Sequence, residues 1–377
     1  MRQRCRKLAT IGLAGIRQRL TGRCNLYKDG KLVSTFRLPS LYVKGSSSLY
    51  QPLTAAYYLF QSTLAILSII LSISRLRTRF HFVIGISAFY AFMGILLKRL
   101  KLVNHVVYYC LDYYPPTSLI NRFSIRLDKF CYENSDVVWN LTPLISKARR
   151  NTFRESLKTQ KELIVPLAYP PKLLTLKPLN EIDRWSIAFI GTLEKMQGLQ
   201  LLVKAMPEIL KRLPKVHVQI IGDGPYADEL KRLVKEAGLD DYFIFYGFVN
   251  RDSDVVKTIS NCAIGIAPYI PVPENNAITT ESSKVKFYTF LGLPVIVTKI
   301  PSGFLIDRKG AGIAVDYDPH KFANAVIKLL KNDEMLIKYR QNAISFAKCY
   351  TSERIFGGAI KITLQTLSKR VGRGRAA

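Results

Sequence analysis

The stretch from residue 185 to residue 298 alternates short apolar runs with amphipathic segments, and several of the apolar runs end in glycine. Two clear examples are the runs at 185–192 and 218–222. Strands of a parallel sheet are buried on both faces and read as continuous apolar runs, so this alternation predicts βαβ units. Ligands of such sheets bind at the carboxyl ends of the strands, so the glycine, serine and threonine residues of the turns there are candidate ligand contacts.

A similar rhythm begins at residue 80 and predicts a first α/β region. The expected strands are 80–86, 105–111, 136–140 and 162–167, and the expected helices between them include 88–100 and 122–132. A proline-containing, aperiodic segment follows and is typical of a linker. We therefore expect an N-terminal α/β domain over 1–172, a linker over 173–184, a C-terminal α/β domain over 185–345, and a last helix with a basic tail over 346–377.

The segment before residue 80 is less regular. Residues 1–20 have the pattern of a basic amphipathic helix, and 25–33 read as strand, Asp-Gly turn and strand. Residues 53–73 form an apolar run that is long enough to span a membrane. Polar residues inside this run, and basic residues on both sides of it, favour a buried or membrane-docked helix instead.

Charge and cysteine content limit the partners. The net charge is +29, and residues 1–170 hold 26 Lys and Arg against 7 Asp and Glu. Such a field favours nucleic acid, anionic lipid or phosphorylated substrates, although a generally basic surface without a partner would have the same composition. The aromatic-basic pattern of single-strand binders is missing, so we expect no nucleic acid. The six scattered cysteines and the lack of an acidic metal motif indicate a cytoplasmic protein without a tightly held metal.

Two glycine-containing turns of the C-terminal domain are suited to phosphate. Gly191-Thr192 closes the first strand, Lys195 lies in the turn, and Gly198 opens the next helix. Free N–H groups at a helix start attract anions, although an ordinary βα turn has the same sequence pattern. Gly222-Asp223-Gly224 follows the next strand and suits a tight turn close to a ligand, because the third glycine of a dinucleotide fingerprint is missing.

Serine and carboxylate residues add further candidates. Ser282-Ser283-Lys284 begins a helix, and its hydroxyls, N–H groups and ammonium together suit a diphosphate, while a routine cap beside a solvated lysine is the plainer alternative. Glu274 and Glu281 flank the preceding loop, where carboxylates can accept hydrogen bonds from sugar or ribose hydroxyls. Asp112 ends an apolar strand of the N-terminal domain, where a carboxylate can orient a hydroxyl or act as a base.

Taken in order, these motifs resemble the donor-binding half of GT-B glycosyltransferases, in particular the retaining family 4 (glycosyl transferases group 1). The resemblance covers most of 185–345 and is looser over 80–170. It rests on residues 189–192 with Gly198, 221–225, 245–247, 267–269, 283–288 and 292–296. It implies an α/β protein of two Rossmann-like domains facing a cleft, with the acceptor on the N-terminal side, the nucleotide sugar on the C-terminal side, and a last helix that returns to the N-terminal domain.

The activity that the resemblance implies is transfer of a hexose, with retention, from a nucleoside diphosphate sugar to a lipid-linked or glycan acceptor at the cytoplasmic face of an anionic membrane. No cofactor besides the sugar nucleotide is implied. The implied catalytic residues are Asp112 and Glu281, and the implied donor-binding residues are Gly191, Thr192, Lys195, Gly222, Gly224, Tyr269, Glu274, Ser282, Ser283, Lys284 and Tyr288. The alternative is a non-catalytic or impaired remnant that still binds a nucleotide sugar.

The chain departs from the family pattern at several positions. Thr192 and Gln197 stand where the family has Arg and Lys, and Thr279 and Phe287 stand where its paired glutamates fall. The family's opening strand and glycine-rich loop have no counterpart near Met1. The resemblance therefore predicts an N-terminal domain that lacks its first strand.

Overall fold

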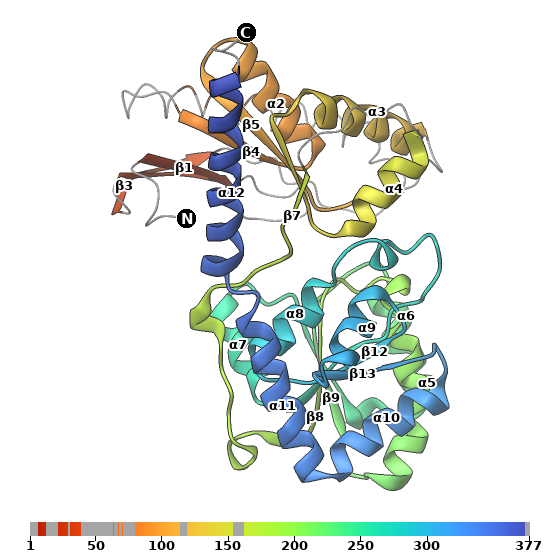
Figure 1. Ribbon diagram of the computed structural model, residues 1–377. Coiled ribbons are helices and arrows are strands. Elements are labelled where there is room, and N and C mark those ends of the chain that lie inside the picture. Colours follow the sequence, from red (N-terminus) through yellow and green to blue (C-terminus); the bar gives the residue numbers. More distant parts are fainter. Residues whose placement is uncertain are drawn as a thin grey trace. The chain divides into compact units, whose positions relative to one another are not determined.

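Two units make up the chain in the computed structural model, and Figure 1 shows both. The structure describes residues 7–12, 22–28, 31–38, 80–113, 119–153 and 162–373, together with Thr63, Leu67 and Ile70. The first unit contains the described residues up to Asn140, residues 150–164, and the chain from Ile360 onward. The second unit contains residues 141–149 and 165–359.

A six-stranded parallel sheet forms the centre of the second unit, with the order β10-β9-β8-β11-β12-β13. Its strands are β8 (Asp183–Ile190), β9 (His217–Ile221), β10 (Phe243–Gly247), β11 (Cys262–Ala267), β12 (Val295–Thr298) and β13 (Gly312–Val315). The predicted parallel βαβ arrangement is thus confirmed. The strand order reverses between β8 and β11, because β9 and β10 follow β8 on one side while β11 to β13 extend the other. In such sheets the reversal point is where ligands bind.

Helices cover both faces of this sheet (Figure 1). One face carries α5 (Leu199–Arg212), α6 (Ala227–Glu236) and α10 (Pro319–Lys331). The other carries α7 (Asp252–Ser260), α8 (Ser283–Phe290), α9 (Pro301–Arg308) and α11 (Asp333–Lys348). Short 3-10 helices occur at η3 (Pro171–Leu173), η4 (Leu179–Glu181), η5 (Lys195–Gln197), η6 (Asp240–Tyr242) and η7 (Asn276–Ile278).

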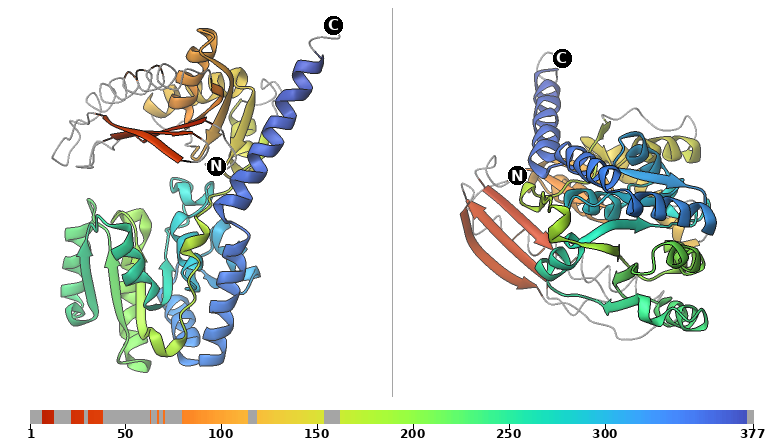
Figure 2. Two further views of the ribbon diagram at one scale, coloured as in Figure 1. Left: turned by 90° about the vertical axis from the view of Figure 1, so that its left-hand side faces the viewer. Right: turned by 90° about the horizontal axis from the view of Figure 1, so that it is seen from below.

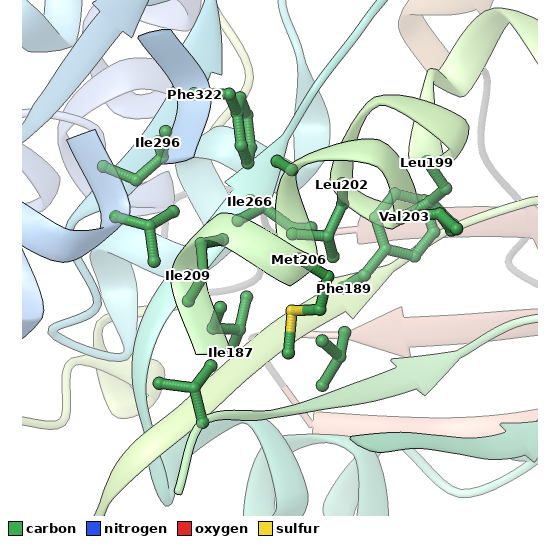
Figure 3. Packing of buried hydrophobic residues seen from close by; sticks show 14 of the residues in the cluster. Ile187, Phe189, Leu199, Leu202, Val203, Met206, Ile209, Ile266, Ile296 and Phe322 are labelled. Carbon is green, nitrogen blue, oxygen red and sulfur yellow. The ribbon is translucent and has the colours of Figure 1, made fainter. Parts of the chain in front are cut away.

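The larger of the unit's apolar clusters lies between the sheet and α5. Figure 3 shows Ile187 and Phe189 of β8 close to Leu202 and Met206 of α5, and all four side chains are buried. Fully burying such a side chain stabilises a fold by about 1.5–3 kcal/mol. The end of β8 is therefore held firmly, and the turn that follows it starts from a fixed position.

The expected linker is bound to the second unit. The N–H of Thr175 donates to the carbonyl of Phe290 at 2.9 Å, and a guanidinium nitrogen of the buried Arg340 donates to the carbonyl of Lys177 at 3.1 Å. Residues 173–184 thus run along the domain that they precede, and β8 already begins at Asp183.

The first unit contains a four-stranded parallel sheet in the order β4-β5-β6-β7 and, nearer the N-terminus, a three-stranded antiparallel sheet, which Figure 2 shows in red. Its strands are β1 (Lys7–Gly12), β2 (Gly22–Lys28), β3 (Lys31–Leu38), β4 (Phe80–Ile86), β5 (Val103–Cys110), β6 (Val137–Asn140) and β7 (Glu162–Ile164). Its helices are α2 (Ala88–Arg99) and α3 (Leu119–Asn134). Both α4 (Pro143–Phe153) and α12 (Ser352–Arg373) hold residues of the two units.

The N-terminal segment shows one error of the sequence interpretation. The helix predicted over 1–20 is wrong in its middle, because residues 7–12 form β1 and pair antiparallel with β2. The strands predicted within 25–33 are confirmed by β2 and β3. The apolar run 53–73 lies outside the described residues, except for Thr63, Leu67 and Ile70, which are helical. Among the residues that the structure describes, no helix is long and apolar enough to cross a membrane.

Candidate functional site

A cavity of about 320 Å³ opens in the second unit, beside the ends of β8 and β11 and the start of α8. This volume lies at the small end of the range for ligand pockets, roughly 300–1,000 Å³. The residues that line it are Tyr169, Ile190, Gly191, Thr192, Gln197, Tyr269, Ser283, Lys284 and Phe287. Five of the predicted donor-binding residues are therefore brought together: Gly191, Thr192, Tyr269, Ser283 and Lys284.

Two glycine turns pack against each other beside the cavity. The N–H of Gly191 donates to the carbonyl of Ile221 at 3.0 Å, and that of Leu193 donates to the carbonyl of Asp223 at 3.0 Å. A methyl group on Gly222, whose φ is 144°, would lie 1.9 Å from the carbonyl oxygen of Gly191. Gly222 and Gly224 thus permit the close approach of the two loops and do not line the cavity. Gly191 lines it without a free N–H, because that group is already bonded.

The start of α8 offers the cavity two N–H groups. Ser282 caps the helix, since its hydroxyl oxygen accepts from the N–H of Val285 at 3.3 Å and lies 2.9 Å from the hydroxyl of Tyr269. The N–H groups of Ser283 and Lys284 have no hydrogen-bond partner within the part of the chain that the structure describes. The expected cap is confirmed, and these two N–H groups, at the positive end of the helix dipole, are suited to an anion.

Lys284 is the charged group of the cavity. Its side chain is buried. The ammonium lies 4.0 Å from the centre of the Phe189 ring and 4.8 Å from the centre of the Tyr269 ring. The same ammonium donates a hydrogen bond to the side-chain oxygen of Gln197. Burial lowers the pKa of Lys284 to about 7, and the carboxylate of Glu194 offsets this only in part. Because no carboxylate of the described chain pairs directly with it, a bound anion would supply the missing charge.

An aromatic wall, formed by Tyr169 and Phe287, closes another side of the cavity. The two ring centres are 5.8 Å apart, and Tyr169 also lies 5.4 Å from the ring of Phe290. The hydroxyl of Tyr169 donates to the carbonyl of Ser283 at 3.1 Å, and burial raises the pKa of this phenol to about 12. The wall is therefore fixed to the same helix start that carries the free N–H groups.

Tyr288, a predicted donor-binding residue, faces the sheet instead of the cavity. Its side chain is buried, and its hydroxyl accepts the N–H of Ile190 at 2.8 Å. The ring packs against Gly265 of β11, where even a methyl group would lie 2.5 Å from it. Tyr288 thus positions the end of β8 and holds α8 against the sheet.

Glu281, predicted as catalytic, forms a buried ion pair. Its carboxylate lies 2.8 Å from the ammonium of Lys286 and accepts the N–H of Leu167 at 2.8 Å. Lys286 also donates to the carbonyl of Leu167 at 2.9 Å and lies 3.7 Å from the ring centre of Tyr350. Burial lowers the pKa of Lys286 to about 8, although Glu281 opposes that shift. Glu281 would have to leave these partners before it could act on a substrate.

The remaining predicted residues lie outside the cavity lining. Lys195 and Glu274 are exposed, and Ser282 acts as the helix cap described above. Asp112 follows β5 in the first unit; its carboxylate reaches solvent, yet the protein around it displaces enough water to raise its pKa. The roles predicted for these residues stay predictions. Among the described residues, no group of three or more His, Cys, Asp or Glu could hold a metal ion.

Sequence reasoning missed Tyr169 and Ile190, and it had noted Gln197 and Phe287 only as departures from a family pattern. One signal for Phe287 was available, because residues four apart on a helix share a face and Phe287 lies four residues after Ser283. Tyr169 gave no such signal. It reaches the cavity only through its packing against α8 in the folded chain.

Known proteins are similar to this chain. The sequence model of the family described as Glycosyl transferases group 1 matches residues 184–332. An uncharacterized glycosyltransferase of Haemophilus influenzae is 23% identical over 69% of this chain and 70% of its own length. A poly(glycerol-phosphate) alpha-glucosyltransferase of Bacillus subtilis is 20% identical over 51% of this chain, but the match spans only 29% of that protein.

A solved structure shares the fold. The crystal structure of Anabaena Alr3699/HepE in complex with UDP superposes with a TM-score of 0.62 at 14% identity, covering 79% of this chain and 82% of that one. The predicted α/β fold class of GT-B glycosyltransferases is thereby confirmed. The expected loss of a first strand stays a prediction. Residues 184–332 are therefore similar to the glycosyl transferases of group 1, and this stretch holds every residue that lines the cavity except Tyr169.

Proposed function

We propose that this protein transfers a hexose from a nucleoside diphosphate sugar and that the cavity of the second unit receives the diphosphate. The observation that carries the proposal is the start of α8. There the free N–H groups of Ser283 and Lys284 and the buried Lys284 ammonium line one cavity, which contains no direct counter-charge among the described residues. Such a set of donors is complementary to a phosphate chain.

The same groups fit the chemistry of the leaving group. When the bond from the sugar to the diphosphate breaks, negative charge grows on the diphosphate oxygens. Preorganised N–H dipoles and a cation in a site that excludes water stabilise such charge strongly. Gln197 holds the Lys284 ammonium in place, and the hydroxyls of Thr192 and Ser283 are further donors at the cavity wall.

We also propose that the donor is a uridine diphosphate hexose. Support for a uridine nucleotide comes from the UDP that the similar Anabaena structure contains. Support for a hexose comes from the relative named as an alpha-glucosyltransferase. We propose retention of configuration, with Asp112 on the acceptor side.

We further propose a lipid-linked or glycan acceptor at an anionic membrane surface on the cytoplasmic side. The support is the excess of basic residues over 1–170, which contain 26 Lys and Arg but only 7 Asp and Glu. Basic clusters bind anionic lipid headgroups.

Calorimetry with UDP, GDP and ADP tests the donor part. We expect a measurable heat of binding with at least one of these nucleotides. Lys284→Met should bind that nucleotide much more weakly. Lys204→Met, a control that removes an exposed lysine of α5, should bind it as the wild type does. Labelled sugar nucleotides with membrane extract then test transfer. Binding without transfer or hydrolysis would point to a remnant that only binds, and no heat with any nucleotide would overturn the proposal.

A further inference from the structure

Lys284 places an amine nucleophile in the cavity of the second unit. Its side chain is only 6% exposed, and its ammonium lies close to the rings of Phe189 and Tyr269. Because burial lowers the pKa of Lys284 to about 7, about half of these lysines carry a neutral amine with a free electron pair at neutral pH. A lysine that is desolvated in this way can attack carbonyl groups.

The amine can be approached from the cavity beside Gly191. This residue also lines the cavity and has no side chain, and a methyl group there would lie 3.1 Å from Nζ of Lys284. Gln197 accepts a hydrogen bond from the same nitrogen and fixes its position. The carboxylate of Glu194 raises the pKa of Lys284, but Glu194 is exposed and lies outside the cavity lining. Space beside Nζ is therefore available to an aldehyde.

The same cavity offers a place for a phosphate. The N–H groups of Ser283 and Lys284 have no hydrogen-bond partner among the described residues and lie at the positive end of the α8 dipole. Six bonds join the backbone nitrogen of Lys284 to its Nζ, so these two nitrogens are at most about 7.5 Å apart. A molecule with a phosphate a few bonds from an aldehyde can contact both. The rings of Tyr169 and Phe287 offer an apolar surface to the rest of that molecule.

We propose that Lys284 forms an imine with aldehydes that carry a phosphate group, and that such aldehydes thereby compete with the sugar nucleotide. Nζ attacks the aldehyde carbon, both hydrogens of the neutral amine leave with the carbonyl oxygen as one water molecule, and a carbon–nitrogen double bond remains. The step is redox-neutral. Once protonated, the imine nitrogen can still donate to the side-chain oxygen of Gln197. The competition rests on the proposed function, whereas the imine does not.

Lys286 separates the effect of the cavity from that of a lowered pKa. It is also buried and has a pKa of about 8, but its ammonium lies 2.8 Å from the carboxylate of Glu281, outside the cavity lining. At pH 7.5 about three quarters of Lys284 and one quarter of Lys286 are neutral, against roughly 0.1% of an exposed lysine. Protonation alone would thus favour Lys284 over Lys286 by only about threefold.

Pyridoxal 5′-phosphate, an aldehyde that forms imines with lysine, tests the proposal on the full-length protein at pH 7.5. Borohydride reduces the imine, and peptide mass spectrometry then measures how fast each lysine is labelled. Lys284 should be labelled at least about tenfold faster than Lys286 and the exposed Lys204, because the N–H groups hold the phosphate beside it. Saturating UDP should protect Lys284.

Pyridoxal, the matched aldehyde without the phosphate, is the control. The ratio of Lys284 to Lys204 labelling corrects for the different reactivity of the two aldehydes, and it should be about tenfold lower or more with pyridoxal. An equal ratio for both aldehydes would overturn the proposal. So would equal labelling of Lys284 and Lys204, or a preference over Lys286 that stays near the threefold expected from protonation.

The outcomes with UDP distinguish the imine from the proposed function. If calorimetry detects no UDP binding while Lys284 is still labelled selectively, the proposed function fails and the imine stands. If UDP binds but leaves the labelling of Lys284 unchanged, the competition is wrong.

Discussion

Binding of a diphosphate should be linked to uptake of a proton by Lys284. Burial holds the pKa of this lysine at about 7 in the empty cavity. A bound anion favours the charged form, so the pKa of Lys284 must rise on binding. The empty site's lysine is about nine-tenths charged at pH 6 and half charged at pH 7, so the affinity falls as the pH rises further and more of the empty sites hold neutral lysine.

The size of the effect follows from the titration. Between pH 7.0 and 8.5 the protonated fraction of a group with this pKa falls about 15-fold, and the affinity for UDP should fall by the same factor, or roughly 1.6 kcal/mol. The terminal phosphate of UDP, with a pKa near 6, is already ionised over this range. The ligand itself therefore contributes little to the change.

Calorimetry at pH 8.0, in buffers of different ionisation enthalpy, measures the proton uptake directly. Wild type should take up about 0.9 proton per UDP bound. Lys284→Met should bind weakly without that uptake, and Lys204→Met should behave as wild type. An affinity that stays constant from pH 7.0 to 8.5, with no proton uptake, would refute the assignment of Lys284 to the diphosphate.

Three further predictions concern stability and are measured by urea or thermal unfolding. Lys284→Met should stabilise the empty protein at pH 7 by on the order of 4 kcal/mol, because the unfolded lysine, with its pKa near 10.4, binds a proton more readily than the buried one, whose pKa is about 7. This advantage should shrink as the pH rises from 7 towards 10; a constant difference would contradict it. Gly222→Ala should cost about 3 kcal/mol or more and abolish nucleotide binding, since a methyl group would lie 1.9 Å from the carbonyl of Gly191. Glu281→Gln should destabilise by about 3–5 kcal/mol by leaving the buried Lys286 without its carboxylate; normal stability with lost transfer would restore the catalytic role of Glu281.

Local sequence signals predicted much of the second unit. The strands over 185–298 were visible because most of them are buried on both faces, β10 at the sheet edge being the exception. The start of α8 was visible because Ser282 is a strong capping residue. The N-terminal strand β1 was missed because the spacing of apolar residues over 1–20 suits a helix, and pairing with β2 overrides that local preference.

The assembly of the site depends on contacts between distant residues, which one sequence does not reveal. Glu281 looked available for chemistry because one of its partners, Leu167, is 114 residues away in sequence and reaches it only in the folded chain. Tyr288 looked like a ligand contact because it shares a motif with Ser283, yet the helix turns it towards the sheet. The sequence could show which helix carries the site, but it could not show which face of that helix the cavity meets.

The bond from Ile190 to the hydroxyl of Tyr288 has a consequence for how such a protein can acquire new substrates. It holds α8 against the central sheet, while Ser283, Lys284 and Phe287 of the same eight-residue helix line the cavity. Exchanging Ser283 or Phe287, which are more exposed than Lys284, does not remove the hydrogen bond between Ile190 and Tyr288. Under the proposed function, these α8 positions are therefore places where donor preference can be changed while the bond between the helix and the sheet is kept.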